Sequence, residues 1–505
     1  MTLSTMRKAL ALAVAALATV ATASITCDTI SSQTSIESLK RFQIKYTAEQ
    51  TEYWSTAAGA LKPACILMPT TTQEVAAIVS ILRGNNETFA IKSGGHNPNN
   101  YFSSIDGGPL ISTKNLDQVI LDPVAETARV GPGNRWDELS AALDGTGFTA
   151  VGGRIGNVGV GGYMLGNGLS FMSTEYGWAA NSVLEFELVL ANSSVVHVTE
   201  SNHPDLFMAL KGGGNNFGIV TSYLLKVYRQ GQVWGGNLIF DANPTVNRKM
   251  LAAIRNFTEN YDDEKAGIIV TAERTLATLV DIWVLFLYYN GPEPPPDVFG
   301  EFFAISPFKL NTCKTQSMNK LLSGNNWAVV KGSVYTIGTE TMPLPSAEDG
   351  AEVMGAIHDH WINTSNKAKL VPGLIASVAF QPIPKRLAAV ARNKGGDMLD
   401  LDPTYDRIIL ELDYSFIGNL SSPKVDQVMR ETYGGFKTIV EDYQESGVLP
   451  RDAYLPLFQN DCYYPQEYFS RLRPEKLALA RRVQEEVDPT GFFHTRTAGF
   501  KIPAA

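Results

Sequence analysis

The stretch Lys92-Ser93-Gly94-Gly95-His96-Asn97 follows a short apolar run, Thr88-Phe89-Ala90-Ile91, that predicts a β-strand. Two adjacent glycines let the backbone turn sharply and expose its N–H groups toward an anion. A histidine directly after them sets a nucleophilic ring beside whatever the backbone holds. The stretch therefore suggests a loop that binds a cofactor diphosphate, with His96 directed at that cofactor. On these six residues alone, an ordinary glycine turn beside a packed histidine stays an open alternative.

A second segment, residues 152–168, is the most glycine-dense part of the chain. Glycine at this density disfavours regular helix or strand, so we expect it to let the backbone approach a ligand closely. The pair Gly159 and Gly161 suggests a Rossmann turn, but that fingerprint needs Gly-x-Gly-x-x-Gly and an acid about 20 residues further on. The spacing here does not fit, and no Walker-type Gly-x-x-x-x-Gly-Lys occurs. Both of these nucleotide-binding motifs are therefore excluded.

Length and composition indicate a folded protein of two or more domains. At 505 residues, with 44% hydrophobic and 18% charged residues, the chain is too long for one simple core. The net charge is -9, and no basic run alternates with aromatic residues. A nucleic-acid partner is therefore not expected.

The first 23 residues predict a secretory signal peptide. Arg7 and Lys8 precede an apolar run over 9–20, and Ala21-Thr22-Ala23 forms a small-x-small cleavage site. The run is shorter than the roughly 20 residues of a membrane span, and no second long apolar run follows. We therefore expect a secreted, extracellular protein without a membrane anchor.

Export predicts disulfides and glycans. Four cysteines allow three pairings, of which we favour Cys27 with Cys65 because both lie near the mature N-terminus. Cys313 is the one cysteine left that could pair with Cys462, and whether the two pair stays open. Five N-x-Ser/Thr sequons are candidate glycosylation sites: Asn86, Asn192, Asn256, Asn363 and Asn419.

Beyond about Gln230 the composition shifts, and a second region runs to about Leu449. Strands are expected over 268–270, 280–289 and 408–416, and amphipathic helices over 247–261, 347–361 and 423–441. Long strands separated by helices predict an α+β sheet layered with helices. The final segment, 450–505, carries a predicted helix over 474–487 and a turn at Asp488-Pro489-Thr490-Gly491.

Taken together, these motifs resemble a known family, the FAD-linked oxidases of the vanillyl-alcohol oxidase superfamily, in the berberine bridge enzyme-like branch and closest to its secreted fungal group. The matching pieces are the opening loop, Val158-Gly159-Val160-Gly161-Gly162 with Leu165-Gly166-Asn167-Gly168, Tyr176–Asn181, Asp205-Leu206-Phe207 with Lys211–Thr221, and Asp488–Phe493. The resemblance implies a two-part FAD-binding domain of the PCMH type, over 24–229 and completed by 450–505. Into it is inserted a substrate-binding domain over 230–449, an antiparallel sheet covered by helices.

In this family the first Gly-Gly loop holds the FAD diphosphate on backbone amides, and the histidine after it bonds to the flavin 8α-methyl, which here implies a covalent link through His96. Many relatives add a cysteinyl link at the position that Ile155 occupies here, so we expect a single histidyl link. Val158 aligns with a position that resembles an oxygen gate, where valine leaves room for O2 and favours an oxidase that makes H2O2. The alternative is that Val158 only packs.

The resemblance also places Asn460 against the flavin, with Tyr463 as its neighbour. The full set of expected cofactor-binding residues is Lys92, Ser93, Gly94, Gly95, His96, Asn97, Val158, Gly159, Gly161, Gly162, Gly166, Gly168, Gly218, Ile219, Val220, Asn460 and Tyr463.

Oxidation of an alcohol or amine by hydride transfer is easiest when a nearby base removes the proton. The strand over 408–416 alternates, with Glu411, Asp413 and Ser415 on one face and Tyr414 on the other. We name Tyr414 and Asn460 as candidate catalytic residues, although a tyrosine packed in a sheet is the commoner case. No metal site is expected, because His358 and His360 lie two apart in a predicted helix and face different ways.

Three functions are compatible with these sequence features. The first is an extracellular FAD oxidase that acts on an alcohol-type carbon of a sugar or small metabolite, with O2 as second substrate. The second is a tailoring flavoenzyme that closes rings or dehydrogenates a natural product. The third is a flavin- or sugar-binding protein without turnover. For each we expect a monomer without a nucleic-acid or membrane partner.

Overall fold

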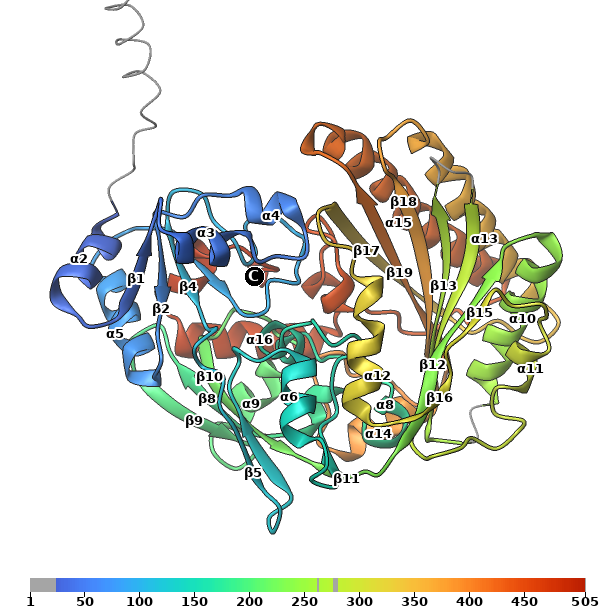
Figure 1. Ribbon diagram of the computed structural model, residues 1–505, viewed down its shortest axis with the longest axis horizontal. Helices are drawn as coiled ribbons and strands as arrows, with labels where there is room; N and C mark the ends of the chain where they lie inside the picture. Colours follow the sequence, from blue (N-terminus) through green and yellow to red (C-terminus); the bar gives the residue numbers. More distant parts are fainter. Residues whose placement is uncertain (1–23, 261–262, 276–279, 505) are drawn as a thin grey trace, which may run out of the picture.

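The computed structural model describes residues 24–260, 263–275 and 280–504. The predicted signal peptide over 1–23 lies outside these residues. Two parts stand side by side, each built on its own sheets, and the C-terminal segment returns to the part in which the chain begins (Figure 1).

The first part contains a small mixed sheet that ends at the opening loop. Its strand order is β1 (Glu37–Lys40), β2 (Cys65–Met68), β4 (Pro109–Ser112) and β3 (Ala90–Lys92), with β2 and β3 parallel to β4. The expected strand over 88–91 is thus β3, and helix α5 (Thr72–Arg83) connects it to β2. Because β3 ends at Lys92, the loop from Ser93 to Asn97 leaves the sheet at its carboxyl edge.

A second, antiparallel sheet completes this part. Its strand order is β5 (Val119–Asp122), β6 (Thr127–Val130), β10 (Ile219–Lys226), β8 (Val183–Val189) and β9 (Val195–Thr199). Strands β8 and β9 are consecutive in the chain and pair as an antiparallel hairpin. The glycine-rich segment differs from expectation, because it contains a short helix, α7 (Val160–Leu165), that begins after Gly159. Burial of Val160, Gly161 and Met164 offsets the low helix propensity of its glycines.

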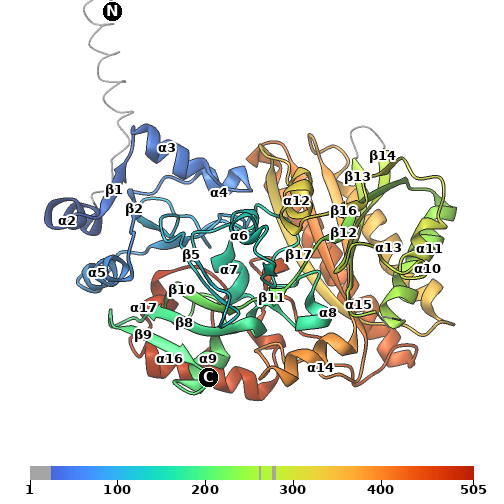
Figure 2. The same cartoon turned by 60° about the horizontal axis from the view of Figure 1, so that its bottom comes forward.

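The second part is an eight-stranded sheet in which every pair of strands is antiparallel. Its order is β15 (Leu310–Asn311), β12 (Val233–Asp241), β14 (Val280–Tyr289), β13 (Ala266–Thr275), β18 (Ile375–Ile383), β19 (Arg407–Phe416) and β17 (Val334–Pro343), with β16 (Lys314–Gln316) paired to β12. Helices α10 (Pro244–Glu259), α13 (Gly350–Ser365) and α15 (Ser422–Ser446) cover one face (Figure 2). The predicted α+β class, with a helix-covered antiparallel sheet, is confirmed.

The other face of this sheet looks toward the first part. Along β19, Leu410, Leu412 and Tyr414 belong to the apolar layer under the helices, whereas Glu411 lines a cavity between the two parts. Ile269 of β13 and Ile337 of β17 line the same cavity. The alternation of side chains along each strand therefore separates the packed face from the face that can meet a ligand.

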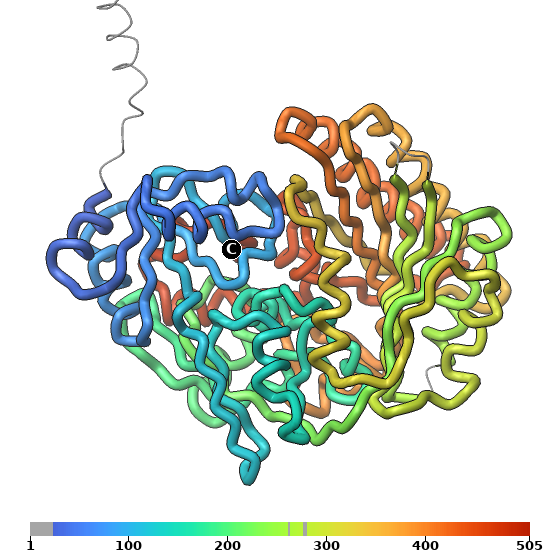
Figure 3. The backbone as a smooth tube through the Cα atoms, viewed as in Figure 1, coloured from blue at the N-terminus to red at the C-terminus, as the bar shows by residue number. Residues whose placement is uncertain are grey.

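The C-terminal segment ties the two parts together, as the path of the backbone shows (Figure 3). Helix α16 (Pro474–Val487) packs on α9 (Pro204–Leu210). In the other direction, the Thr341 hydroxyl of β17 donates to the Pro456 carbonyl at 2.6 Å. The predicted disulfide between Cys27 and Cys65 is present and joins helix α2 (Ile25–Gln33) to β2. Cys313 and Cys462 are both free, which answers the question that the sequence left open about their pairing.

Candidate active site

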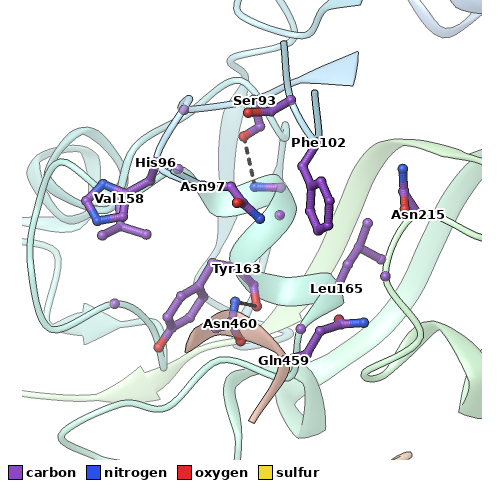
Figure 4. A pocket seen from close by; sticks show the side chains of 18 of the residues that line it. Ser93, His96, Asn97, Phe102, Val158, Tyr163, Leu165, Asn215, Gln459 and Asn460 are labelled. Atoms are coloured by element: carbon purple, nitrogen blue, oxygen red, sulfur yellow. Dashed lines mark hydrogen bonds between the residues drawn. The ribbon is translucent and has the colours of Figure 1, made fainter. Parts of the chain in front are cut away.

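A cavity of about 330 Å³ lies where the loops of the first part meet the open face of the large sheet. Backbone and small side chains form much of its wall, from segments 93–98, 153–166, 214–220 and 458–461. His96 and Val158 lie at one end of the close-up and Asn215 at the other, with Tyr163 and Asn460 below (Figure 4). Sequence segments that are more than 360 residues apart thus share one site.

The two glycine-rich loops touch directly, backbone against backbone. A Cβ added at Gly94 would lie 2.5 Å from the Cα of Gly159, and one added at Gly159 would lie 2.4 Å from the nitrogen of Gly94. The Ser93 hydroxyl fixes this contact, since it donates to the Pro132 carbonyl at 2.6 Å and accepts from the Gly161 N–H at 3.2 Å (Figure 4). Only glycine fits at this contact, and the result is a wall of exposed peptide groups.

His96 stacks on Trp54, with ring centroids 4.3 Å apart and planes inclined by 6°. Burial, together with the positive charge of Arg135, lowers the pKa of His96 to about 3. The imidazole is therefore neutral at physiological pH and keeps a free lone pair, which a nucleophile requires.

Acidic side chains gather where the sheet and the C-terminal segment meet. Gln381 of β18 donates to the Asp461 carboxylate at 2.9 Å and accepts from the guanidinium of Arg154. Burial raises the pKa of Glu411, an effect that the positive charge of Arg154 partly offsets. Burial, and then the charge of Glu411, raise the pKa of Asp461 well above its ordinary value. Each of the two carboxyls therefore holds its proton more strongly than an ordinary acidic side chain does.

Most of the predicted cofactor-binding residues line this cavity. They are Ser93, Gly94, Gly95, His96, Asn97, Val158, Gly159, Gly161, Gly162, Gly166, Gly218, Ile219, Val220 and Asn460.

Three of the predicted cofactor-binding residues lie elsewhere. The Lys92 ammonium lies behind the loop, buried 2.7 Å from the Glu49 carboxylate, because alternation along β3 turns its side chain away from the cavity. Tyr463 donates its hydroxyl to Asp426 at 2.6 Å. Gly168 acts indirectly, since its N–H donates to the Asn460 amide oxygen at 3.2 Å.

The two predicted catalytic residues differ in their placement. Tyr414 faces the helices, fully buried, with its hydroxyl 2.8 Å from Ser365 and 3.3 Å from Thr432, so it cannot meet a substrate in the cavity. Glu411 takes its place as the group of β19 that faces the cavity. Asn460 does line the cavity, held by Gly168 and by a 3.4 Å bond from its amide nitrogen to the Tyr163 carbonyl.

Several lining residues were not among the predicted site residues: Trp54, Phe102, Arg154, Glu411 and Asp461. The strand pattern did hold a signal for Glu411, because the opposite face of β19 is apolar and a polar face is the one that stays uncovered by helices. The sequence held no such signal for Trp54, because its role depends on a loop that approaches His96 only in the folded structure. Within the described ranges, no group of three or more histidine, cysteine, aspartate or glutamate side chains is arranged to hold a metal ion.

The comparisons with known proteins agree with this geometry. Residues 63–199 match the family model described as FAD binding domain. An uncharacterized FAD-linked oxidoreductase of Arthroderma benhamiae is 41% identical over 460 residues, covering 90% of this chain and 91% of the relative. The bifunctional solanapyrone synthase of Alternaria solani is 37% identical over 251 residues, covering 50% of this chain and 48% of that protein. In fold, the chain resembles the carbohydrate oxidase of Microdochium nivale, with a TM-score of 0.75 at 19% identity over 95% of this chain and all of that one.

The fold and the cavity define a flavin-dependent oxidoreductase. The chain belongs to the family of FAD-linked oxidoreductases that carry this FAD binding domain.

The residues present fit FAD. The contact between Gly94 and Gly159 leaves backbone in place of side chains along the cavity wall, as close approach of a diphosphate requires. Among the described residues that line the cavity, Arg154 is the one with a permanent positive charge, and it is engaged with Gln381. An anion there would therefore be bound mainly by uncharged donors, namely peptide N–H groups and polar side chains such as Asn97 and Asn215.

Proposed function

We propose that the protein is a secreted oxidase that carries FAD on His96, oxidises an alcohol-type carbon of a sugar or small metabolite, and produces H2O2. When bound, FAD supplies the ring that accepts a hydride at N5 and passes the electrons to O2. The observation that carries the proposal is that His96, Glu411 and Asp461 line one glycine-walled cavity.

In this proposal the loops 93–97 and 158–166 hold the diphosphate on backbone N–H groups, and Gly218, Ile219 and Val220 complete the wall. His96 makes the only covalent link. Ile155, which lines the cavity at the position where relatives carry a second tether, has no nucleophilic atom. Val158 also lines the cavity, in support of an opening through which O2 reaches the ring.

Glu411 is the proposed base. It faces the cavity from the middle of β19, between Thr339 of β17 and Ala379 of β18. Its pKa is raised by burial, so it binds a proton more strongly than an ordinary glutamate and is better matched to an alcohol proton. The charge of Arg154 lowers the pKa of both Glu411 and Asp461 and so limits how far burial raises them. Asn460 orients the substrate or the ring through its amide.

Export and a monomeric state complete the proposal. The Cys27–Cys65 disulfide supports passage through an oxidising compartment. None of the helices within the described residues is both long and apolar enough to cross a membrane.

The alternative is a tailoring enzyme that performs oxidative cyclisation or dehydrogenation, which the similarity to a solanapyrone synthase over half of the chain favours. The fold of the carbohydrate oxidase favours the sugar substrate. Both uses need the same flavin and base, so the substrate decides between them.

The deciding experiment supplies the purified holoprotein with a panel of oligosaccharides and aromatic alcohols in air and measures H2O2 and the product. We expect peroxide equimolar with the oxidised product. A ring-closed product from a small metabolite, with no reaction on sugars, would replace the first function by the second. Flavin that no substrate reduces would refute both.

A further inference from the structure

The loop between α3 (Ile44–Thr51) and α4 (Thr56–Ala60) crosses from the first part to the large sheet. On one side, the Trp54 N–H donates to the Gly95 carbonyl at 3.0 Å. On the other side, the Thr56 N–H donates to the Ser333 carbonyl at 2.9 Å, and the Tyr335 N–H donates to the Ser55 hydroxyl at 3.1 Å. The backbone of this loop is therefore fixed to both walls of the cavity.

Trp54 occupies the middle of a three-ring stack. Its indole lies 4.3 Å from the imidazole of His96 on one face and 4.2 Å from the ring of Tyr335 on the other, with planes inclined by 6° and 28°. Tyr335 is itself fixed, because its hydroxyl donates to the Val330 carbonyl at 2.7 Å. Trp54 is 8% exposed, so little room remains for the indole to turn.

Among the described residues, no hydrogen bond fixes the plane of the imidazole. Neither ring nitrogen of His96 makes a hydrogen bond to any residue within the described ranges, whereas a functional histidine commonly has one nitrogen fixed by such a bond. The stack on Trp54 is therefore the directional contact that holds the plane of the ring.

We infer that Trp54 is a positioning residue for covalent attachment of FAD, which holds the His96 imidazole in the plane from which a ring nitrogen reaches the flavin methyl group. The inference rests on the proposed link through His96. In the attachment, a C–N bond forms between the imidazole and the 8α-methyl carbon, while one C–H bond of that methyl and the N–H bond of the imidazole break. The two electrons and two protons that are released reduce O2, a reactant of the proposed oxidase, to H2O2.

The test compares Trp54→Leu, which keeps apolar volume but no ring, with Trp54→Phe, which keeps an aromatic face. Trp327→Leu is the matched control, because Trp327 is half-exposed and does not line the cavity. For each purified protein, total flavin is measured in the folded state and covalent flavin in the acid-precipitated pellet. Each is then incubated with excess FAD in air, and the covalent fraction is followed over time.

We expect Trp54→Leu to bind FAD but to attach it at least about tenfold more slowly than the unaltered protein, because a misplacement of about 1 Å can cost up to about 100-fold in rate. Trp54→Phe should recover most of the rate, and Trp327→Leu should match the unaltered protein. Equal rates in Trp54→Leu, no recovery in Trp54→Phe, or a loss of total flavin in step with covalent flavin would each overturn the positioning role. Absence of acid-stable flavin in the unaltered protein would instead refute the link through His96, and the inference with it.

Discussion

Replacing Gly159 with alanine tests whether the contact between the two glycine-rich loops builds the FAD site. The added Cβ would lie 2.4 Å from the nitrogen and 2.6 Å from the Cα of Gly94, and 2.9 Å from the Ser93 hydroxyl. Ordinary contact begins at 3.4 Å, so the loops would have to separate by about 1 Å. The obstructing atoms are mostly backbone and cannot swing aside as the end of a long side chain would.

We expect two consequences of different size. Overpacking of this kind costs about 1–3 kcal/mol of folding free energy, which lowers the temperature of thermal unfolding. The effect on FAD should be larger than the loss of stability alone implies, because Ser93 loses its bond to Gly161 as the loops part. A shift of about 1 Å in a wall that holds a diphosphate on peptide groups can weaken a positioned interaction by about 100-fold.

The assay measures flavin per polypeptide and the unfolding temperature of the purified variant. Gly355→Ala is the control, since Gly355 lies in helix α13, where an added Cβ meets no atom within 4 Å. That control should keep its full flavin content and unfold at the same temperature or slightly higher. A Gly159→Ala protein with undiminished flavin would refute the claim that this backbone contact shapes the site.

Three further predictions follow from the acidic residues and the sequons. Glu411→Gln should lower kcat/KM by about 100- to 10,000-fold at unchanged flavin content. In the unaltered enzyme, kcat/KM should decrease toward acid at a higher pH than an ordinary glutamate would give, because burial raises the pKa of Glu411 and the base must be ionised. Asp413→Asn should stabilise the protein at pH 7 by on the order of 1 kcal/mol or more but not at pH 4, as thermal unfolding at the two pH values will show. Burial and neighbouring carboxyls raise the pKa of Asp413, so the folding stability that its protonated form gives is present below the pKa of an unfolded aspartate and is lost as the pH rises through the raised value. Glycopeptide mapping after expression in a secreting host should find Asn256 unmodified, because it is half-buried in helix α10 and its amide nitrogen donates to Glu301, while the four exposed sequons, Asn86, Asn192, Asn363 and Asn419, accept glycans.

The strands that sequence could predict are those with a local apolar signal. β14 has the predicted bounds, and β19 differs by one residue. β17 was not predicted from sequence, because four of its residues are polar and give it no apolar pattern. All four are nevertheless buried: Thr336, Thr339, Glu340 and Thr341. Distant partners satisfy these buried polar groups. The Gln466 side chain accepts from the Thr339 N–H at 3.1 Å and donates to its carbonyl at 2.7 Å, while Arg471 pairs with Glu340 and Pro456 accepts from Thr341. No local pattern encodes a pairing across 127 residues.

Strand β12 was not predicted from sequence for a different reason. Gly235 and Gly236 interrupt its apolar run, yet the chain there must pass close to its neighbour. A Cβ at Gly236 would lie 2.7 Å from the backbone of Thr312 and Cys313. The glycines therefore mark a close crossing of two chain segments and do not end the strand.

In the candidate site, too, the locally encoded features were predicted and those that depend on distant contacts were not. Residues within the glycine motifs were placed correctly because the loops themselves form the wall. Lys92 and Tyr463 were misplaced because adjacency in sequence does not fix the direction of a side chain. Tyr414 was preferred to Glu411 because alternation defines two faces of β19, and only the packing of helices α13 and α15 shows which face they cover.

The covalent attachment of FAD to His96 is the claim that can be tested most directly. The purified, denatured protein is digested, and the peptide that contains Ser93 to Asn97 is examined by mass spectrometry, in the unaltered protein and in His96→Ala. We predict that this peptide carries the added mass of FAD, placed on His96 by fragmentation, and that His96→Ala releases its flavin on denaturation. An unmodified His96 peptide from flavin-loaded protein, or acid-stable flavin in His96→Ala, would contradict the account.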